Sequence, residues 1–399
     1  MRHNIVLVLI AALLLSGCVF PIQRTSPDPP VAPDLIEEPS DLEDFDRPVD
    51  SEAESPAAPA PSIPAVAGDA AYSVPSDDPQ IAVFWYAMAD ARVEELREEL
   101  TTCMDELGFP CVEYDAENDA STQLDQVRSA VADGRDLLLV NLVAEGSREA
   151  GEEILRAAGD CPVIFFDRVP TTDDGRIATI SDSTRVSSVY VDCEEFGRVQ
   201  GEMVGSLLSE LFWDADLNGD GHISYTIFVN DGDDLASIEY SEACIQAGNA
   251  VLAQDGLPAL QYFTDPIPDG PGNFQWSPDN PGSSEGANAL MLANLSLCNE
   301  ENGNMIELVI AESDEMALGA LTALQSSWYN LGDGVSTSIP LFGIGATAGG
   351  STAVALGQMA GSVDLNAAGI VAAVSDLIVC LINGEELPSF VPVAPVPLW

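Results

Sequence analysis

The sequence contains no lysine, and its 13 basic residues, all arginine, stand against 66 aspartates and glutamates. The last arginine is Arg198, so the C-terminal half of the 399-residue chain carries no fixed positive charge. A formal net charge of −53 excludes nucleic acid as a partner, because phosphate neutralisation requires Lys and Arg. Binding of the protein surface to anionic lipid is disfavoured for the same reason. Salt screens the self-repulsion of so many carboxylates, so the composition is compatible with a high-salt habitat.

Histidine is almost absent, since only His3 and His222 occur. The sequence also lacks a Gly-x-Ser-x-Gly nucleophile elbow, a phosphate-binding loop and a His-rich metal set. Ser-His catalysis would have to use His222, which lies in an acidic loop described below. We therefore expect a binding protein, and an enzyme is the less favoured alternative.

Cysteine is present eight times, but never as a CxxC pair, so a zinc site is poorly supported. Outside the cytoplasm, disulfide bonds would be expected instead. Cys18 belongs to an N-terminal leader, and seven cysteines remain, an odd number. We expect the pairs Cys103–Cys111 and Cys244–Cys298, and leave the remaining connectivity open.

The only long apolar run of the leader extends from Ile5 to Leu15. It is too short to span a bilayer as a helix, which takes about 20 residues, but it suits a signal peptide. The run ends in Leu15-Ser-Gly-Cys18, which resembles the lipobox of bacterial lipoproteins. This resemblance implies that residues 1–18 are a lipoprotein signal peptide and that Cys18 is lipidated. Ordinary secretion with a structural Cys18 is the alternative.

Residues 19–78 are rich in proline and acids and have almost no apolar periodicity. Such a stretch cannot bury enough surface to offset the entropy of ordering it. We expect a disordered acidic tether that holds a soluble domain away from the membrane, so that the lipid anchor is the only membrane contact.

From Ile81 onwards, short apolar strand segments alternate with segments of helical periodicity. We expect strands at 81–86, 111–114, 137–143, 162–166, 224–229, 260–263, 307–311, 340–344 and 362–365, and an extended segment at 390–396. We expect helices at 92–107, 122–131, 149–158, 194–212, 235–252, 286–297, 314–328, 347–356 and 367–382. This alternation predicts an α/β fold with two doubly wound Rossmann-like lobes. Ligands of such sheets bind at the carboxyl ends of strands, where Asp90, Asn141, Asp167 and Arg168 are expected.

An oxygen-rich loop follows the helix expected at 194–212. Asp216, Asn218 and Asp220 alternate along it, and this spacing suits a hard cation such as Ca²⁺. An EF-hand would place its bidentate Glu at Ile227, which lies in an apolar strand, so the last carboxylate must come from elsewhere. An acidic turn that holds no ion is the alternative.

The assembled residues resemble the bacterial periplasmic sugar-binding proteins of the ribose/galactose type, especially their calcium-containing galactose/glucose-binding members. The resemblance is most specific in segments 213–224 and 306–319. It implies a Ca²⁺ site in which Glu307 supplies the distant carboxylate, His222 a backbone carbonyl, and Ser224 replaces a side-chain amide. It also implies a type 1 periplasmic-binding-protein fold, with a three-strand hinge crossing near Val191, Leu365 and Val391. The implied lobes are 79–190 plus 366–390 and 191–365 plus 391–399.

The same resemblance implies a set of ligand-contacting residues in the cleft: Asp90, Asn141, Asp167, Arg168, Tyr240, Trp276, Ser313 and Asn366. A cleft-rim ion pair is the alternative for Asp167 and Arg168, and local packing is the alternative for Trp276. The sequence departs from the family pattern where Tyr240 stands for an Arg, Ser313 for an Asn and Gly345 for an Asp.

The resemblance implies a lipid-anchored substrate-binding protein of an ABC sugar importer, located in the cell envelope and facing the periplasm or the exterior. We expect a monomer that binds a neutral, galactose- or glucose-like monosaccharide and delivers it to a permease. The alternative is a sensor that feeds a chemoreceptor and binds a pentose or another polyhydroxyl compound.

Overall fold

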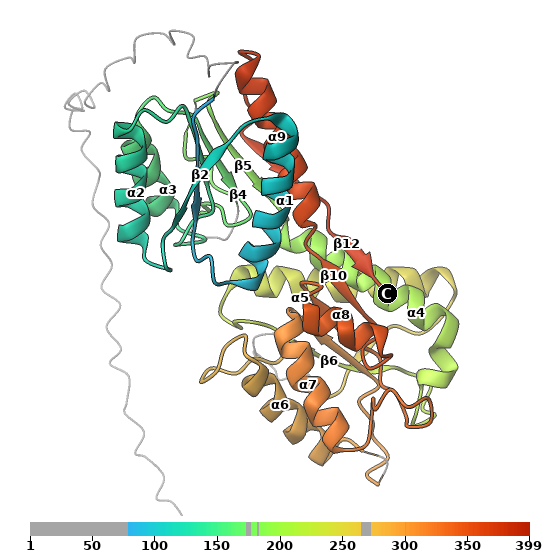
Figure 1. Ribbon diagram of the computed structural model, residues 1–399. Coiled ribbons are helices and arrows are strands. Elements are labelled where there is room, and N and C mark those ends of the chain that lie inside the picture. The colour runs from blue at the N-terminus through green and yellow to red at the C-terminus, as the bar shows by residue number, and fades with distance from the viewer. Residues whose placement is uncertain (1–78, 173–176, 182, 265–272, 300) are drawn as a thin grey trace, which may run out of the picture. The chain divides into compact units, whose positions relative to one another are not determined.

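The computed structural model describes residues 79–172, 177–181, 183–264, 273–299 and 301–399. The expected signal peptide, Cys18 and the tether lie outside the described residues. Within the described ranges the chain forms nine helices and twelve strands, and the strands assemble into two six-stranded sheets (Figure 1).

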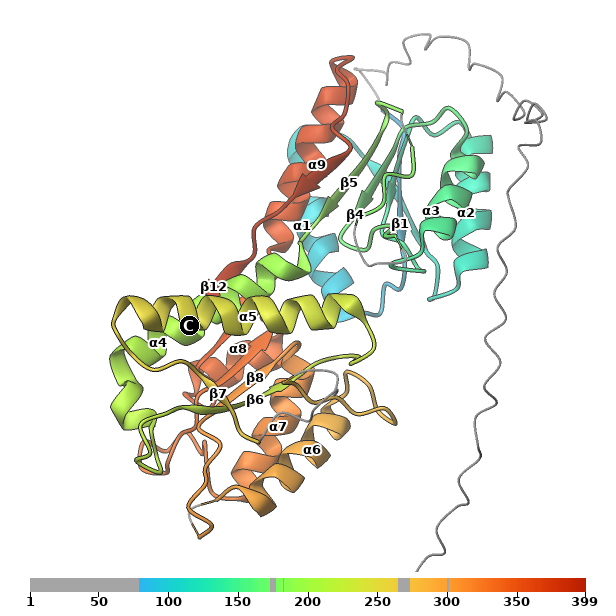
Figure 2. The same cartoon turned by 180° about the vertical axis from the view of Figure 1, so that it is seen from behind.

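The first sheet is parallel throughout, with strand order β11-β5-β4-β3-β1-β2. Its strands are β1 (Ile81–Trp85), β2 (Cys111–Asp115), β3 (Leu137–Val140), β4 (Val163–Phe166), β5 (Val186–Tyr190) and β11 (Phe390–Pro392). Two helices, α1 (Ala91–Leu107) and α9 (Ala367–Ile382), cover one face, and α2 (Ala120–Ala132) and α3 (Arg148–Ala158) cover the other (Figure 2). Because both faces are covered, the central strands are continuous apolar runs.

The second sheet has the order β12-β10-β9-β8-β6-β7, and only β12 is antiparallel to its neighbour. Its strands are β6 (Ser224–Phe228), β7 (Gln261–Tyr262), β8 (Leu308–Ala311), β9 (Leu341–Ile344), β10 (Gly361–Asp364) and β12 (Val396–Leu398). Its first face is covered by α4 (Cys193–Ala215) and α5 (Leu235–Gln254). Its second face is covered by α6 (Ser284–Leu297), α7 (Asp314–Ser326) and α8 (Ala348–Ala355).

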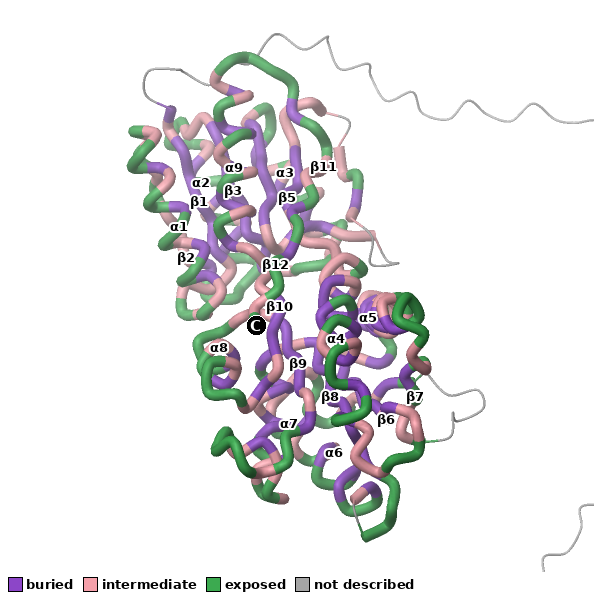
Figure 3. Tube along the Cα trace, turned by 90° about the vertical axis from the view of Figure 1, so that its right-hand side faces the viewer, coloured by how far each residue is buried: buried purple, intermediate pink, exposed green. Residues whose placement is uncertain are grey.

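The buried residues follow the strands of each sheet (Figure 3). In the first sheet, Trp85 of β1 and Phe166 of β4 are fully buried and pack edge to face, with ring centroids 5.2 Å apart. Among the described residues, the only buried charged residues are Glu307, Glu312 and Asp314. Of the helices in the described ranges, none has the length together with the apolar character that crossing a bilayer requires.

The architecture confirms the expected fold class of two doubly wound α/β lobes. Strand β5 was not among the expected strands, because two serines interrupt its apolar pattern; both Ser187 and Ser188 are nevertheless buried. The chain changes sheets at 191–192, at 365–366 and again at 393–395. The third change lies beyond the expected position near Val391, since Phe390–Pro392 still pairs with β5 in the first sheet.

The expected disulfide bonds are not formed: all seven cysteines in the described residues are free thiols. Cys244 lies on α5, in the core on one face of the second sheet, whereas Cys298 ends α6 in the core on the opposite face. The sheet separates these two thiols. Cys103 and Cys111 both pack against the apolar core beneath α1 and α9, but as separate, unbonded side chains.

Candidate functional site

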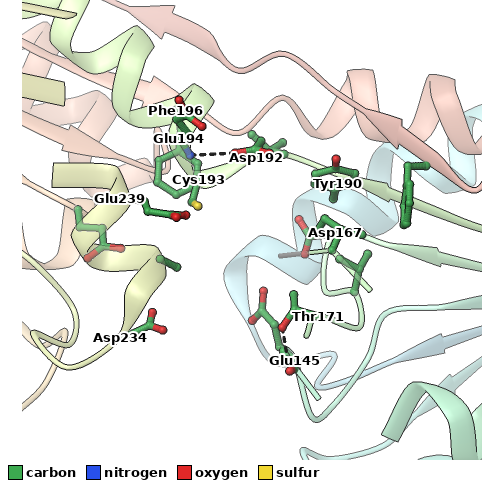
Figure 4. A pocket seen from close by; sticks show the side chains of 17 residues that line it. Glu145, Asp167, Thr171, Tyr190, Asp192, Cys193, Glu194, Phe196, Asp234 and Glu239 are labelled. Carbon is green, nitrogen blue, oxygen red and sulfur yellow. Dashed lines mark hydrogen bonds between the residues drawn. The ribbon is translucent and has the colours of Figure 1, made fainter. Parts of the chain in front are cut away.

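A cavity of about 700 Å³ lies where loops after the carboxyl ends of the first sheet's strands meet the first turns of α4 and α5. Asp167 and Tyr190 follow or end strands β4 and β5, and Glu312 follows β8 of the second sheet. Figure 4 shows Asp167, Thr171 and Glu145 on one side of this cavity and Asp234 and Glu239 on the other. Its place at strand ends and its size suit a small ligand.

Asp167 is the one expected ligand residue that lines this cavity. Its backbone has φ +60°, a left-handed conformation uncommon outside glycine, which turns the chain sharply after β4. Its carboxylate accepts hydrogen bonds from Arg92 Nε and from Asn141 Nδ2, each at 3.2 Å. Asn141 is fully buried, and its amide also donates to the Phe166 carbonyl, so it holds Asp167 from beneath.

Arg168 forms an ion pair with Glu145, at 2.8 Å. Its guanidinium also donates to the carbonyls of Leu142 and Val143, at 2.8 and 2.9 Å, and lies 4.1 Å from the ring centre of Tyr86. The N–H groups of the Arg168 guanidinium are therefore occupied by contacts within the protein. Arg168 is not part of the cavity wall.

Three of the expected ligand residues begin helices. Asp90 caps α1 by accepting from the amides of Arg92 and Val93. Ser313 caps α7, and Asn366 caps α9. A side chain that accepts hydrogen bonds from the first helical turn stabilises the helix start by about 1 kcal/mol. None of the three lines the cavity.

Tyr240 and Trp276 also lie outside the cavity wall. Tyr240 is fully buried in the core between α4 and the second sheet, and its hydroxyl donates to Gln200 Oε1 at 2.6 Å. Trp276 packs on Gly232 so closely that a Cβ there would lie 2.3 Å from the indole nitrogen. This close contact fits the local-packing alternative for Trp276. The roles of both residues in ligand binding stay predictions.

Apart from Asp167, the residues of the cavity wall were not predicted from the sequence, among them Glu145, Tyr190, Asp192, Glu194, Phe196, Asp234, Glu239 and Glu312. Recognising β5 would have placed Tyr190 and Asp192 at a strand end. The apolar strand β8, followed at once by Glu312, carried the same signal.

Glu312 is the most buried acid of the wall, with 9% of its surface exposed. Its Oε2 accepts from the Asn230 amide at 2.6 Å and from the Ser237 hydroxyl at 2.8 Å. Burial, opposed by these hydrogen bonds, raises the pKa of this carboxyl from 4.5 to about 7. Near neutral pH it can therefore act as acceptor or donor.

The acidic loop folds around its own carboxylates. Asp216 accepts hydrogen bonds from the backbone amides of Gly219, Asp220 and Gly221, at 2.8 to 3.1 Å. Asp220 accepts from the amide of His222 at 2.9 Å and from Asn218 Nδ2 at 3.1 Å. The turn that the Asp-x-Asn-x-Asp-Gly spacing predicts is therefore present.

Glu307, just before β8, reaches this loop. Its fully buried carboxylate accepts from the backbone amides of Leu217, Asn218 and Ser224, at 2.7, 3.1 and 3.0 Å. Burial raises the pKa of this carboxyl, and the three hydrogen bonds act in the opposite direction. The structure thus brings together the six residues of the expected metal set: Asp216, Asn218, Asp220, His222, Ser224 and Glu307.

This donor set has the chemistry that Ca²⁺ prefers, with carboxylate, amide, hydroxyl and carbonyl oxygens. Glu307 is a buried carboxylate that accepts hydrogen bonds from three uncharged backbone amides, and a cation would compensate its charge. Within the described residues, however, no three Asp, Glu, His or Cys side chains converge as a metal-binding group. The fit therefore rests on a mixed oxygen set rather than on a carboxylate cluster.

Comparison with known proteins finds relatives over most of the described chain. Residues 81–386 match a family described as periplasmic binding protein domain. The D-galactose/methyl-galactoside binding periplasmic protein MglB of Haemophilus influenzae is 26% identical over 302 residues, which cover 74% of this chain and 79% of that protein.

Solved structures share the fold. The Caulobacter myo-inositol binding protein, bound to myo-inositol, has a TM-score of 0.54 at 20% identity, covering 80% of this chain and 92% of its own. The periplasmic ribose ABC transporter protein of Conexibacter woesei has a TM-score of 0.59 at 17% identity, covering 82% and 92%.

Proposed function

The chain belongs to the periplasmic binding protein domain family, and on this premise we propose that it is the solute-binding protein of an ABC importer for a sugar-type solute. The family match and the cavity at the strand ends support this proposal together. The Haemophilus relative is named for binding galactose and methyl-galactoside. Galactose and glucose are the first candidates as neutral monosaccharides, and pentoses are the second.

The charges of the cavity disfavour an anionic solute. Beyond Arg198 the sequence has no basic residue, so the walls from α5 and β8 offer no charge-assisted clamp for phosphate or carboxylate. On the opposite side of the cavity, Arg92 and Arg168 lie outside the wall and pair with Asp167 and Glu145. A binding role is proposed in place of catalysis, since the one histidine in the described residues lies in the acidic loop.

A calorimetric screen of the full chain in high salt tests the proposed function. We expect binding of a monosaccharide or related polyol, and no binding of the matching sugar acids and sugar phosphates. Asp167→Asn should weaken binding, whereas Glu210→Gln, an equivalent change on the exposed face of α4, should leave it unchanged. Tight binding of a sugar phosphate, with all uncharged sugars silent, would contradict the proposal.

We also propose that Cys18 carries a lipid anchor and that the acidic loop holds Ca²⁺. The sequence Leu15-Ser-Gly-Cys18 at the end of the apolar run supports the anchor. Expressed in a bacterium, the protein should incorporate labelled palmitate, and Cys18→Ser should abolish the label. Label that survives in this variant would refute the assignment. The contacts of Glu307 with the loop support the Ca²⁺ site.

A further inference from the structure

The charged side chains that line the cavity are all acidic. Glu145 and Asp167 each pair with an arginine of the protein. Five further carboxylates line the cavity: Asp192, Glu194, Asp234, Glu239 and Glu312. Among the described residues no arginine lies at ion-pair distance from any of these five.

Glu312 shows that this charge is not merely a solvated surface. Its side chain is nine-tenths buried at the cavity wall, and its partners, the Asn230 amide and the Ser237 hydroxyl, are both uncharged. Burying an ionised carboxylate without a cation is costly, whereas a buried pair recovers much of that cost. A cation in the cavity would complete this site.

Asp234 supplies a second acceptor beside Glu312. It begins α5, where an aspartate normally accepts from the first helical turn, yet its side chain makes no such hydrogen bond. Asp90, Asp119 and Asp192, the other aspartates that begin helices in the described residues, all do. The carboxylate of Asp234 therefore remains available at the cavity, where Figure 4 shows it.

We propose that the solute carries a protonated amine, that is, an amino-substituted sugar or polyol whose ammonium group is held by Glu312 and Asp234. This inference rests on the proposed function of the cavity as a sugar-binding site. It differs in the charge of the solute, which is a hydroxylated cation instead of a neutral sugar. Hydrogen bonds from an ammonium to carboxylates are about twice as strong as neutral ones. Carboxylates on both sides of the cavity repel each other when it narrows, and a cation between them offsets that repulsion and favours closure.

Matched pairs of probes test this proposal by calorimetry on the full chain. Each pair differs by one amine for one hydroxyl: galactosamine and galactose, glucosamine and glucose, 1-amino-1-deoxysorbitol and sorbitol. At a pH where the amines are protonated, at least one amine should bind about 30-fold more tightly than its neutral partner, or about 2 kcal/mol. Glu312→Gln and Asp234→Asn should each remove most of this difference, and Glu210→Gln, which is outside the cavity, should retain it.

The outcomes separate the two proposals. Neutral sugars that bind as tightly as their amines would overturn the cationic solute and leave the sugar-binding function standing. Amine binding that Glu210→Gln weakens as much as Glu312→Gln would also overturn it, because bulk attraction to an acidic protein would then suffice. If neither the amines nor any neutral sugar or polyol bound, the sugar-binding function itself would fail.

Discussion

Glu312 is a side chain whose burial destabilises the folded protein but whose position on the cavity wall suits it to bind a cation. The strand β8 delivers it from a buried apolar run directly to the cavity wall. Burial raises the pKa of Glu312, and the negative charge of Asp234 raises it further. The neighbouring Tyr240 is fully buried and uncharged, so it does not compensate the charge of Glu312. The charged form of Glu312 therefore destabilises the folded protein, and a bound cation would offset this effect.

This cost predicts a pH dependence of stability. The pKa of Glu312 is about 7 in the folded protein and 4.5 as the ordinary value, so the folded state favours the protonated form. The stability that protonated Glu312 contributes to the folded state is fully present below about pH 4.5 and is lost as the pH rises through about 7. Glu312→Gln keeps an acceptor for the Asn230 amide and cannot ionise. Relative to the wild type, this variant should gain up to about 3 kcal/mol in unfolding free energy between about pH 4.5 and 8.

Denaturant melts of both proteins across this pH range measure the difference. Glu210→Gln, whose carboxylate is exposed on α4, should give a difference that does not vary with pH. A constant offset between Glu312→Gln and the wild type at every pH would show that the Glu312 carboxyl titrates normally.

The sequence placed several side chains at the right strand ends without revealing their direction. Asn141 is at the end of β3 as expected, but it points beneath Asp167, where it is fully buried. Asp90 and Ser313 also follow strands, and there they cap the next helix. A strand end and a helix N-cap lie within a few residues of each other in α/β folds, so both roles compete for one polar residue. Sequence position alone does not decide between them.

At the scale of elements, periodicity predicted all the helices of the described residues and most of the strands. It failed at β5, where buried Ser187 and Ser188 give a strand without an apolar run. It also read 390–396 as one extended segment, although Phe390–Pro392 and Val396–Leu398 join different sheets. Pairing partners are long-range and leave no local pattern. By contrast, the acidic loop was predicted well, because its turn depends on local Asp and Gly spacing.

The packing of α4 on α5 predicts a specific weakness at Gly201. A Cβ at this position would lie 2.1 Å from the carbonyl oxygen of Cys244, a backbone atom that cannot rotate away. Overpacking in Gly201→Ala should therefore lower the free energy of unfolding by about 1–3 kcal/mol, which outweighs the gain of about 1 kcal/mol in helix propensity. Ser206→Ala, on the exposed side of the same helix, should be neutral or slightly stabilising. Thermal melts of the two variants would contradict this packing if Gly201→Ala were the more stable.

The acidic loop predicts calcium-dependent stability. An ion that binds only the folded state adds about 2.7 kcal/mol at a hundredfold excess over its Kd. Chelation should therefore lower the melting temperature of the wild type, and excess Ca²⁺ should restore it. Glu307→Gln keeps the shape of the buried side chain but removes its charge, so its melt should no longer respond to chelator. Asp279→Asn, an exposed acid outside the loop, should respond as the wild type does. Identical melts of calcium-loaded and exhaustively chelated wild type would contradict a calcium site.

The whole molecule carries a formal net charge of −53 with only 13 compensating cations, and this imbalance reaches from the surface to the cavity wall. Several ion pairs in the described residues are exposed, as for Arg128 with Asp125, and such pairs contribute about 0–1 kcal/mol each. The folded state therefore depends on its apolar cores and on screening of the remaining repulsion.

Stability at neutral pH should consequently rise with salt. Between about 0.1 M and 1 M ionic strength the Debye length falls from about 10 Å to about 3 Å, which removes most repulsion between neighbouring surface carboxylates. We expect the melting temperature of the calcium-saturated protein to rise over this range, equally in NaCl and KCl. Near pH 4 the effect should shrink, because Asp and Glu, with pKa values of about 3.9 and 4.3, are then roughly half protonated. A salt effect of the same size at both pH values would point to preferential exclusion of salt from the surface instead of charge screening. An unchanged or falling melting temperature at neutral pH would show that the carboxylates do not limit stability.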